Sequence, residues 1–142
     1  MSDKEKFEGF KRDLIEENER RYGAEVRQKY GGQAVDASNE KMRAMGGGDY
    51  KDVQELEAHL ARRLKEAAAT GDPASHIAQS VCELHKKWLC MYWPHGMYSK
   101  EAHLALGEMY VEDPRFREYY DAICPGGAKF LHDALIIFCS QR

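Results

Sequence analysis

The sequence predicts an all-α fold of six or seven helices joined by short connections. Apolar residues recur at the three- and four-residue spacing of an amphipathic helix along most of the chain. β-branched residues are few, and no stretch alternates cleanly between apolar and polar positions, as a strand would. Residues that start or stop helices, such as Asp-Pro, Thr-Gly and runs of glycine, separate the periodic segments.

The first third of the chain predicts two helices with little apolar surface. One is expected from Lys4 to Lys29, with an apolar stripe that Asn18 weakens and a kink at Gly23. A shorter one is expected from Val35 to Met45, and the glycines at 46–48 end it.

Because this segment has long charged faces and a thin apolar stripe, we expect that it cannot fold alone. We therefore expect one domain with two parts. Residues 1–48 form a mobile helical lid, and residues 49–142 form a helical ligand-binding core.

The core begins with two strongly patterned helices. The apolar stripe from Val53 to Ala67 predicts a helix that Thr70-Gly71 ends. Asp72-Pro73 then predicts the start of another, with Asp72 as its N-cap and Pro73 at its first helical position. This helix is apolar on two faces, so we expect it to lie centrally between neighbours.

Three further starts follow along the chain. Ser99 is expected to cap the next helix, and Asp113-Pro114 repeats the Asp-Pro device. The last helix is expected after the Pro-Gly-Gly run at 125–127. The unequal helix lengths argue against a regular four-helix bundle.

Composition excludes several classes of protein. The 142 residues carry a net charge of −3, with lysine and arginine interleaved with glutamate, so no basic face for nucleic acid is visible. The longest apolar run, 134–139, is too short to span a bilayer, and the charged N-terminus lacks a signal peptide. The four cysteines are scattered and read as reduced thiols, so we expect a cytoplasmic protein.

Unusual side chains are concentrated between residues 85 and 120. Eight aromatic residues and three histidines lie there, and His103, Gly107 and Tyr110 share one helical face. Glycine inside a helix costs about 1 kcal/mol relative to alanine, so Gly107 indicates close approach of another helix or of a flat ligand. Aromatic residues at this density form either a packed core or the walls of a ligand pocket, and the pattern alone leaves both open. The pocket interpretation requires an empty space with aromatic walls beside Gly107, which we expect.

Signals for chemistry are weak, and we expect neither an enzyme nor a cofactor. A metal site drawn from Cys82, His85, Cys90 and His95 would need two close ligand pairs, which the spacing does not provide. Haem bound through His85 or His103 remains an alternative without a recognisable pocket. No nucleophile elbow or phosphate-binding loop is present in the sequence.

The stretch from His103 to Phe116 resembles the signature of the TipAS domain, the antibiotic-recognition half of MerR-class regulators. That signature is a His, then Leu-Gly-Glu-Met-Tyr-Val, then Asp-x-Arg-Phe, and it is met at 103, 106–111 and 113–116. Weaker matches flank it at the following positions: Tyr22 with Val26-Arg27 and Tyr30-Gly31, Gly71 to Ala74, His85-x-x-Trp88, and Ala128 to Ala134.

The resemblance implies a globin-like helical fold without haem, which binds bulky hydrophobic or heteroaromatic antibiotics of the thiopeptide kind. It implies that Tyr22 and Tyr30 close over a ligand resting on aromatic residues of the core. The candidate ligand-binding residues are Trp88, Tyr92, Tyr98, His103, Gly107, Tyr110, Phe116, Tyr22, Tyr30 and His85.

Two departures from the family pattern matter. The founding member captures thiopeptides through a cysteine two residues after the motif histidine, where this sequence has Ala105, so we expect reversible binding. A MerR-type regulator also carries a DNA-binding half, which these 142 residues do not include. The chain is then either a free-standing drug-sequestering protein or the effector part of a longer regulator, as a monomer or a homodimer. The alternative is a helical protein-interaction domain with no small-molecule ligand.

Overall fold

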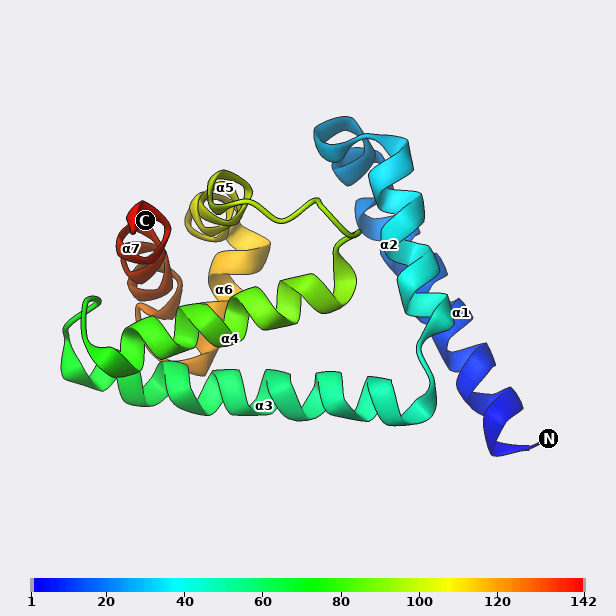
Figure 1. Cartoon of the computed structure of the whole chain (residues 1–142), viewed down its shortest axis with the longest axis horizontal. Coiled ribbons are helices and arrows are strands. Elements are labelled where there is room, and N and C mark those ends of the chain that lie inside the picture. The colour runs from blue at the N-terminus through cyan, green and yellow to red at the C-terminus, as the bar shows by residue number, and fades with distance from the viewer. Residues whose placement is uncertain (1, 142) are drawn as a thin grey trace. The chain divides into compact units, whose positions relative to one another are not determined.

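A computed structural model describes residues 2–141 and confirms the all-α class, with seven helices and no strand among those residues (Figure 1). Figure 1 labels the helices in chain order. They are α1 (Asp3–Tyr30), α2 (Gly32–Ala44), α3 (Gly47–Thr70), α4 (His76–Tyr92), α5 (Lys100–Glu112), α6 (Pro114–Ile123) and α7 (Gly127–Ser140).

The chain forms two compact units. The N-terminal unit comprises the residues up to Gln54 together with Cys90–Met97, and the core unit comprises Glu55–Leu89 and the residues from Tyr98 onward. Both α3 and α4 therefore contribute to each unit. The expected lid, residues 1–48, lies inside the N-terminal unit, and its mobility stays a prediction.

Two of the expected helix starts are confirmed, and one is wrong. The side chains of Ser99 and Asp113 accept backbone hydrogen bonds at the starts of α5 and α6. Asp72, by contrast, accepts from the backbone of Ala74 within a turn, and α4 starts only at His76. Ser75 caps α4 instead, because its hydroxyl accepts from the backbone of Ala78.

The glycines of the first half act differently from the expectation. Gly47 and Gly48 do not separate two helices, because they form the first turn of α3, and the Asp49 carboxylate accepts from the backbone of Gly46. Gly23 lies inside an uninterrupted α1, where a Cβ atom would collide with the Glu19 side chain.

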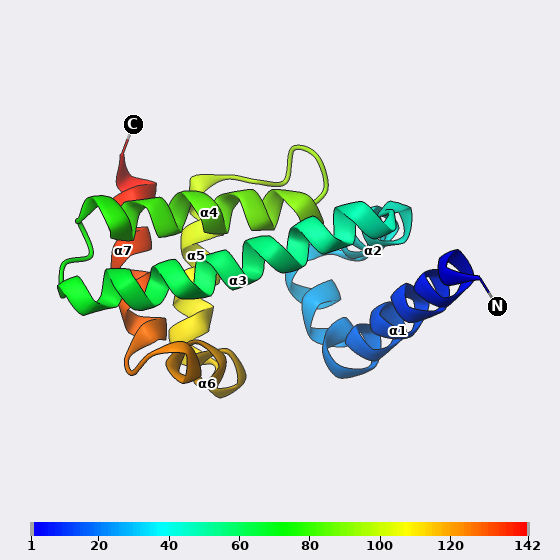
Figure 2. The ribbon, with the colours of Figure 1, turned by 90° about the horizontal axis from the view of Figure 1, so that it is seen from below.

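The core unit is built from two helix groups. α3 and α4 lie side by side, joined by hydrogen bonds from Arg63 to Ser80 and from Trp88 to Glu57. α5 packs along α7, and both contact α6 (Figure 2). The buried apolar residues of the core unit are Leu56, Leu60, Leu64, Ala67, Ala78, Val81, Cys82, Leu89, Leu106, Tyr110, Tyr120, Cys124, Ala128, Leu131, Ala134 and Leu135.

The N-terminal unit has a thin interior organised around a charged side chain. Lys11 is 2% exposed, and its ammonium donates to the carbonyl oxygens of Arg43 and Met45 at 2.5 and 2.6 Å. Those carbonyls lie at the C-terminal end of α2, where intrahelical partners run out. Glu8 pairs with the same ammonium at 3.0 Å. The buried apolar residues of this unit are Ile15, Met42, Met45 and Val53.

No single helix within residues 2–141 is long and apolar enough to cross a bilayer, whereas α6 and α7 together meet the length and composition criteria as a pair bent by 97°. The four cysteines carry free thiols, and Cys82 and Cys124 are buried.

Candidate functional site

A chain of hydrogen bonds runs through the interior of the core unit and links four of the predicted site residues. The hydroxyl of Tyr98 lies 2.7 Å from His103 Nδ1, and His103 Nε2 lies 2.8 Å from His85 Nδ1. His85 Nε2 then lies 3.1 Å from the hydroxyl of Tyr110. Both imidazoles are fully buried. The family motif thus meets the centre of α4 through its histidine and its tyrosine.

Burial keeps His85 and His103 uncharged. Desolvation, and then the neighbouring His103, lower the pKa of His85 to about 3. Desolvation, and then the charge of Lys86, lower the pKa of His103 to about 4. A neutral imidazole has one donor and one acceptor nitrogen, so the chain is complete when all its hydrogen bonds point the same way, in either direction.

Tyr110 extends the chain to Tyr120 on α6. Their rings lie 4.5 Å apart, and a hydrogen bond joins their side chains. Burial nevertheless raises the pKa of Tyr120 above its usual range. Aromatic contacts surround the chain, with Phe138 edge-on to His103 and Phe116 5.7 Å from Tyr110. The interior of the core unit is therefore a hydrogen-bonded aromatic cluster without charge.

Three of the predicted residues in this unit are partly exposed and so accessible to a ligand. Trp88 donates through Nε1 to Glu57 at 3.0 Å, and its ring lies 5.6 Å from His85. Tyr98, which precedes α5, has the Lys86 ammonium 4.8 Å from its ring centroid. Phe116 is also half-buried. These side chains rest on the buried histidines and tyrosines, which hold them in place.

Gly107 has a packing partner where a hollow was expected. A Cβ atom at this position would lie 2.8 Å from Leu135 Cδ1 and 3.6 Å from His132 Cδ2. The glycine therefore lets α7 approach α5 closely. The expectation of an empty space beside Gly107 is wrong on the side where a Cβ would point, because Leu135 fills it. The Nε2 atom of neighbouring His132 is buried without a hydrogen-bond partner in the described residues.

The remaining predicted residues belong to the N-terminal unit. Tyr22 and Tyr30 lie on α1 and Tyr92 at the end of α4, all partly exposed. The Tyr30 hydroxyl is buried, and no described group hydrogen-bonds to it. Since buried hydroxyls usually have a partner, this orphaned oxygen is a suitable position for a polar group of a ligand or a water.

The cysteines offer little for covalent capture. Ala105 occupies an exposed position on α5, two residues after the motif histidine. Burial raises the pKa of Cys82 to about 12, so its thiol stays protonated and unreactive. Burial also raises the pKa values of Cys124 and Cys139. Cys90 is exposed, and it belongs to the N-terminal unit.

The alternative metal site drawn from the sequence is not assembled. Cys82 and His85 lie in the core unit, whereas Cys90 and His95 lie in the other. Over residues 2–141, no group of three or more histidine, cysteine or acidic side chains is arranged to hold a metal ion. His85 has both ring nitrogens engaged by His103 and Tyr110 instead.

Sequence reasoning missed three partners at this site. It did not pair His85 with His103, and it did not include Tyr120 or Glu57 among the site residues. A signal for the first was present, because each histidine lies on the apolar face of its own helix, where a polar ring needs a partner. Nothing in the local sequence indicates the other two.

Comparison with known proteins gives a consistent result. The sequence profile of the TipAS antibiotic-recognition domain matches residues 22–138. The transcriptional activator mta of Bacillus subtilis is 26% identical over the whole chain, and the transcriptional activator TipA of Streptomyces coelicolor is 34% identical over 81% of it. The chain covers 54% and 46% of these two proteins, and so spans about half the length of these relatives.

A solved structure shares the fold. It is TipAS from Streptomyces lividans in complex with the thiopeptide nosiheptide, and it superposes with a TM-score of 0.70 at 32% identity. The match covers 85% of each chain. The profile match, the shared fold and the motif residues gathered around the buried histidines together show that this chain belongs to the family of TipAS antibiotic-recognition domains.

Proposed function

We propose that this chain reversibly binds bulky, largely apolar antibiotics of the thiopeptide class. The observation that carries the proposal is the likeness in fold and sequence to a TipAS structure that holds nosiheptide. The aromatic cluster of the core unit supports it, because rings provide stacking area and hydroxyl groups provide orientation for a flat heteroaromatic ligand.

The burial of the predicted residues divides them into two roles. Trp88, Tyr98 and Phe116 are partly exposed and are proposed to contact the antibiotic. His85 and His103 are fully buried, and Tyr110 is 3% exposed, so they are proposed to act as positioning residues. Gly107 is proposed to serve the same end, because the close approach of α7 to α5 fixes the helix that carries the motif.

Binding without a covalent bond follows from the chemistry of the thiols. Thiolates rather than thiols attack electrophiles, and burial disfavours the thiolate at three of the four cysteines. With Ala105 two residues after the motif histidine, no thiol nucleophile is available at that position. We therefore infer a non-catalytic binding module that releases its ligand unchanged.

The place of this module in a larger protein is also a proposal. Its relatives are named as helix-turn-helix transcriptional activators, and each has about as much chain again beyond the matched part. We propose that this chain acts as the antibiotic-sensing part of such a bacterial regulator, in the cytoplasm, or as a separate protein that sequesters the drug.

Thermal unfolding in the presence of nosiheptide tests the proposal. A ligand that binds only the native state stabilises it by about 2.7 kcal/mol at one hundred times its dissociation constant, so Tm should rise with ligand concentration. Trp88→Ala should weaken the shift, because it removes a large contact surface. The matched control is Trp93→Ala, which removes the same kind of side chain from the N-terminal unit.

The intact mass measured after denaturation separates reversible from covalent binding. We expect the unmodified mass, for the natural chain and for Cys90→Ser alike. A stable adduct lost in Cys90→Ser would overturn reversible binding. The absence of any Tm shift with nosiheptide or other aromatic antibiotics would favour the alternative, a helical protein-interaction domain.

A further inference from the structure

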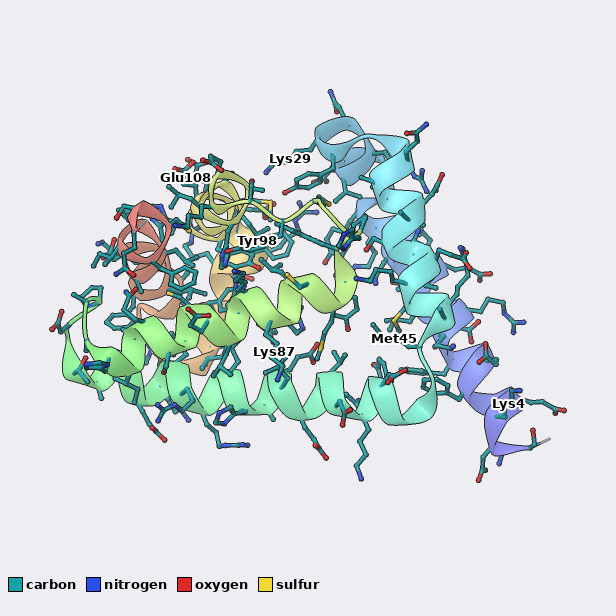
Figure 3. All side chains as sticks on the ribbon, in the orientation of Figure 1. Lys4, Lys29, Met45, Lys87, Tyr98 and Glu108 are labelled. Atoms are coloured by element: carbon teal, nitrogen blue, oxygen red, sulfur yellow. The ribbon has the colours of Figure 1, made fainter. Side chains whose placement is uncertain are left out.

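A pocket of about 350 Å³ lies entirely within the N-terminal unit, where the end of α2 meets the first turns of α3. Figure 3 labels Met45, which follows the last residue of α2 and lines this pocket. The volume falls in the range of small-molecule sites, roughly 300–1,000 Å³. The lining residues are Lys41, Ala44, Met45, Asp49, Asp52, Val53 and Met91.

The floor of this pocket is apolar and adaptable. Met45 and Val53 are 9% and 2% exposed, and Met91 is half-buried. Methionine side chains are flexible and polarisable, and proteins use them where one surface must accept apolar groups of different shapes. The floor therefore suits a compact hydrocarbon or aromatic body.

Two carboxylates stand at the rim of the pocket. Asp49 and Asp52 are exposed, and Asp49 neighbours both Asp52 and Val53 on α3 because it lies three and four residues before them. Asp49 accepts one hydrogen bond, from the backbone of Gly46 at 3.2 Å. No described residue donates a hydrogen bond to Asp52. Both carboxylates thus keep capacity for a cationic group.

The lysines near the pocket offset only part of this charge. The Lys41 ammonium donates to the carbonyl oxygens of Cys90 and Trp93 at 2.9 and 2.8 Å. Lys11, which holds the Met45 carbonyl, is paired with Glu8. Among the lining residues, two carboxylates therefore face one ammonium that is already engaged, and an anionic ligand would be repelled.

We propose that this pocket is a separate binding site for a small organic cation, namely a protonated amine carried on a compact apolar body. The apolar body contacts Met45, Val53 and Met91, and the ammonium lies between Asp49 and Asp52. The site shares no residue with those proposed to contact the antibiotic, so it stands independently of that function.

Three probes with one apolar body and different charges test the site: 4-phenylbutylamine, 4-phenyl-1-butanol and 4-phenylbutyrate. Binding to the full chain is followed through the methyl signals of Met45 and Met91 in ¹³C-methionine-labelled protein. We expect the amine to bind about threefold to tenfold more tightly than the alcohol, since exposed ion pairs contribute modestly, and the carboxylate to bind most weakly.

The double variant Asp49→Asn/Asp52→Asn should bind the amine and the alcohol equally, because asparagine retains the hydrogen-bond acceptor but not the charge. The control Glu112→Gln/Glu118→Gln changes the net charge equally on exposed positions of the core unit and should keep the preference. Equal binding of all three probes to the natural chain would overturn the proposal. So would methyl signals that none of the probes shifts.

Nosiheptide binding by the same variants separates this proposal from the function proposed above. The antibiotic should raise Tm equally in the natural chain and in Asp49→Asn/Asp52→Asn. Loss of amine preference with an unchanged nosiheptide shift is the expected pattern. If the two ligands lose affinity together, they share one site, and the proposal of a separate site is wrong.

Discussion

The core unit and the N-terminal unit satisfy their buried polar groups in different ways. In the core unit, two neutral imidazoles bridge tyrosine hydroxyls, and no charge enters the interior. In the N-terminal unit, a buried ammonium reaches the carbonyl oxygens at the end of α2. Lys41 repeats this contact on the carbonyls of Cys90 and Trp93. The core unit relies on a hydrogen-bonded network of neutral side chains. The N-terminal unit relies on lysine ammonium groups that donate to carbonyl oxygens at helix ends.

The two units also differ in how many apolar side chains they bury. The core unit buries leucines and aromatic rings from five helices, whereas four apolar residues are buried in the N-terminal unit: Ile15, Met42, Met45 and Val53. Apolar burial is the main favourable term in folding. From this contrast we propose that the core unit is a stable scaffold and the N-terminal unit a marginal segment, whose order a bound ligand would increase.

Acid is expected to have the largest effect, through the core unit. With a native pKa of about 3 for His85 and about 4 for His103, against about 6.5 when unfolded, the unfolded chain binds more protons between those values. Stability should be full above pH 6.5 and fall as the pH drops below it. Near pH 5 the unfolded chain should bind almost two protons more than the native chain. The free energy of unfolding should therefore fall by about 2.7 kcal/mol for each pH unit of acidification.

Urea unfolding at pH 7, 6 and 5, followed by circular dichroism, measures this slope. His103→Gln keeps a donor and an acceptor but does not titrate, so its slope should be about half as steep. An unfolding free energy that stays constant between pH 6.5 and 5 would show that the imidazoles already bind protons in the native state.

Gly127→Ala is the next largest perturbation and also concerns the core unit. Its Cβ would lie 2.4 Å from the backbone oxygen of Tyr120, which cannot move aside as a side chain can. We expect a loss of roughly 3 kcal/mol, from the upper range for overpacking. Gly47→Ala is the control, because no atom lies within 4 Å of its Cβ position. Equal stabilities of the two variants would contradict the tight contact between α6 and α7.

Lys11→Met tests the N-terminal unit. The methionine keeps an apolar stem but leaves the carbonyls of Arg43 and Met45 without their donor, a cost of about 1–3 kcal/mol. Hydrogen exchange should quicken in α1 and α2 while α7 keeps its protection. Lys6→Met, at an exposed position, is the control. Faster exchange spread evenly over both units would contradict their separate responses.

Arg27→Gln should have the smallest effect. Its guanidinium pairs with Glu19 at 2.5 Å and Asp36 at 2.7 Å, and the surrounding solvent screens both pairs. Any loss of Tm should disappear in 1 M salt, because screening already removes the interaction in the natural chain. A loss that persists in high salt would indicate a packing role for the side chain.

The sequence predicted the features that depend on local periodicity. Apolar spacing placed His85 on an inward face, and the motif spacing placed His103 and Tyr110 together on another. The caps at Ser99 and Asp113 follow from residue type alone. The prediction that Asp72 caps α4 was wrong because an aspartate side chain also stabilises turns, and Ser75 caps the helix instead.

The features that depend on tertiary packing could not be read from the sequence. The pairing of the two histidines joins residues from different helices, and its distance is set by how α4 and α5 pack. In the sequence, Lys11 looks like a surface residue of a charged helix. Its burial is explained only by the hydrogen bond from its ammonium to the carbonyl oxygen of Arg43 at the end of α2. Gly107 indicated close approach correctly, but the approaching group is Leu135.

Hydrogen exchange with and without saturating nosiheptide tests most directly whether this chain is an antibiotic receptor with one stable and one marginal unit. We predict that bound antibiotic slows exchange in α1 and α2, with a smaller change in α4 and α7, whose buried residues should already protect their amides. Identical exchange in both units with and without the antibiotic would contradict this account.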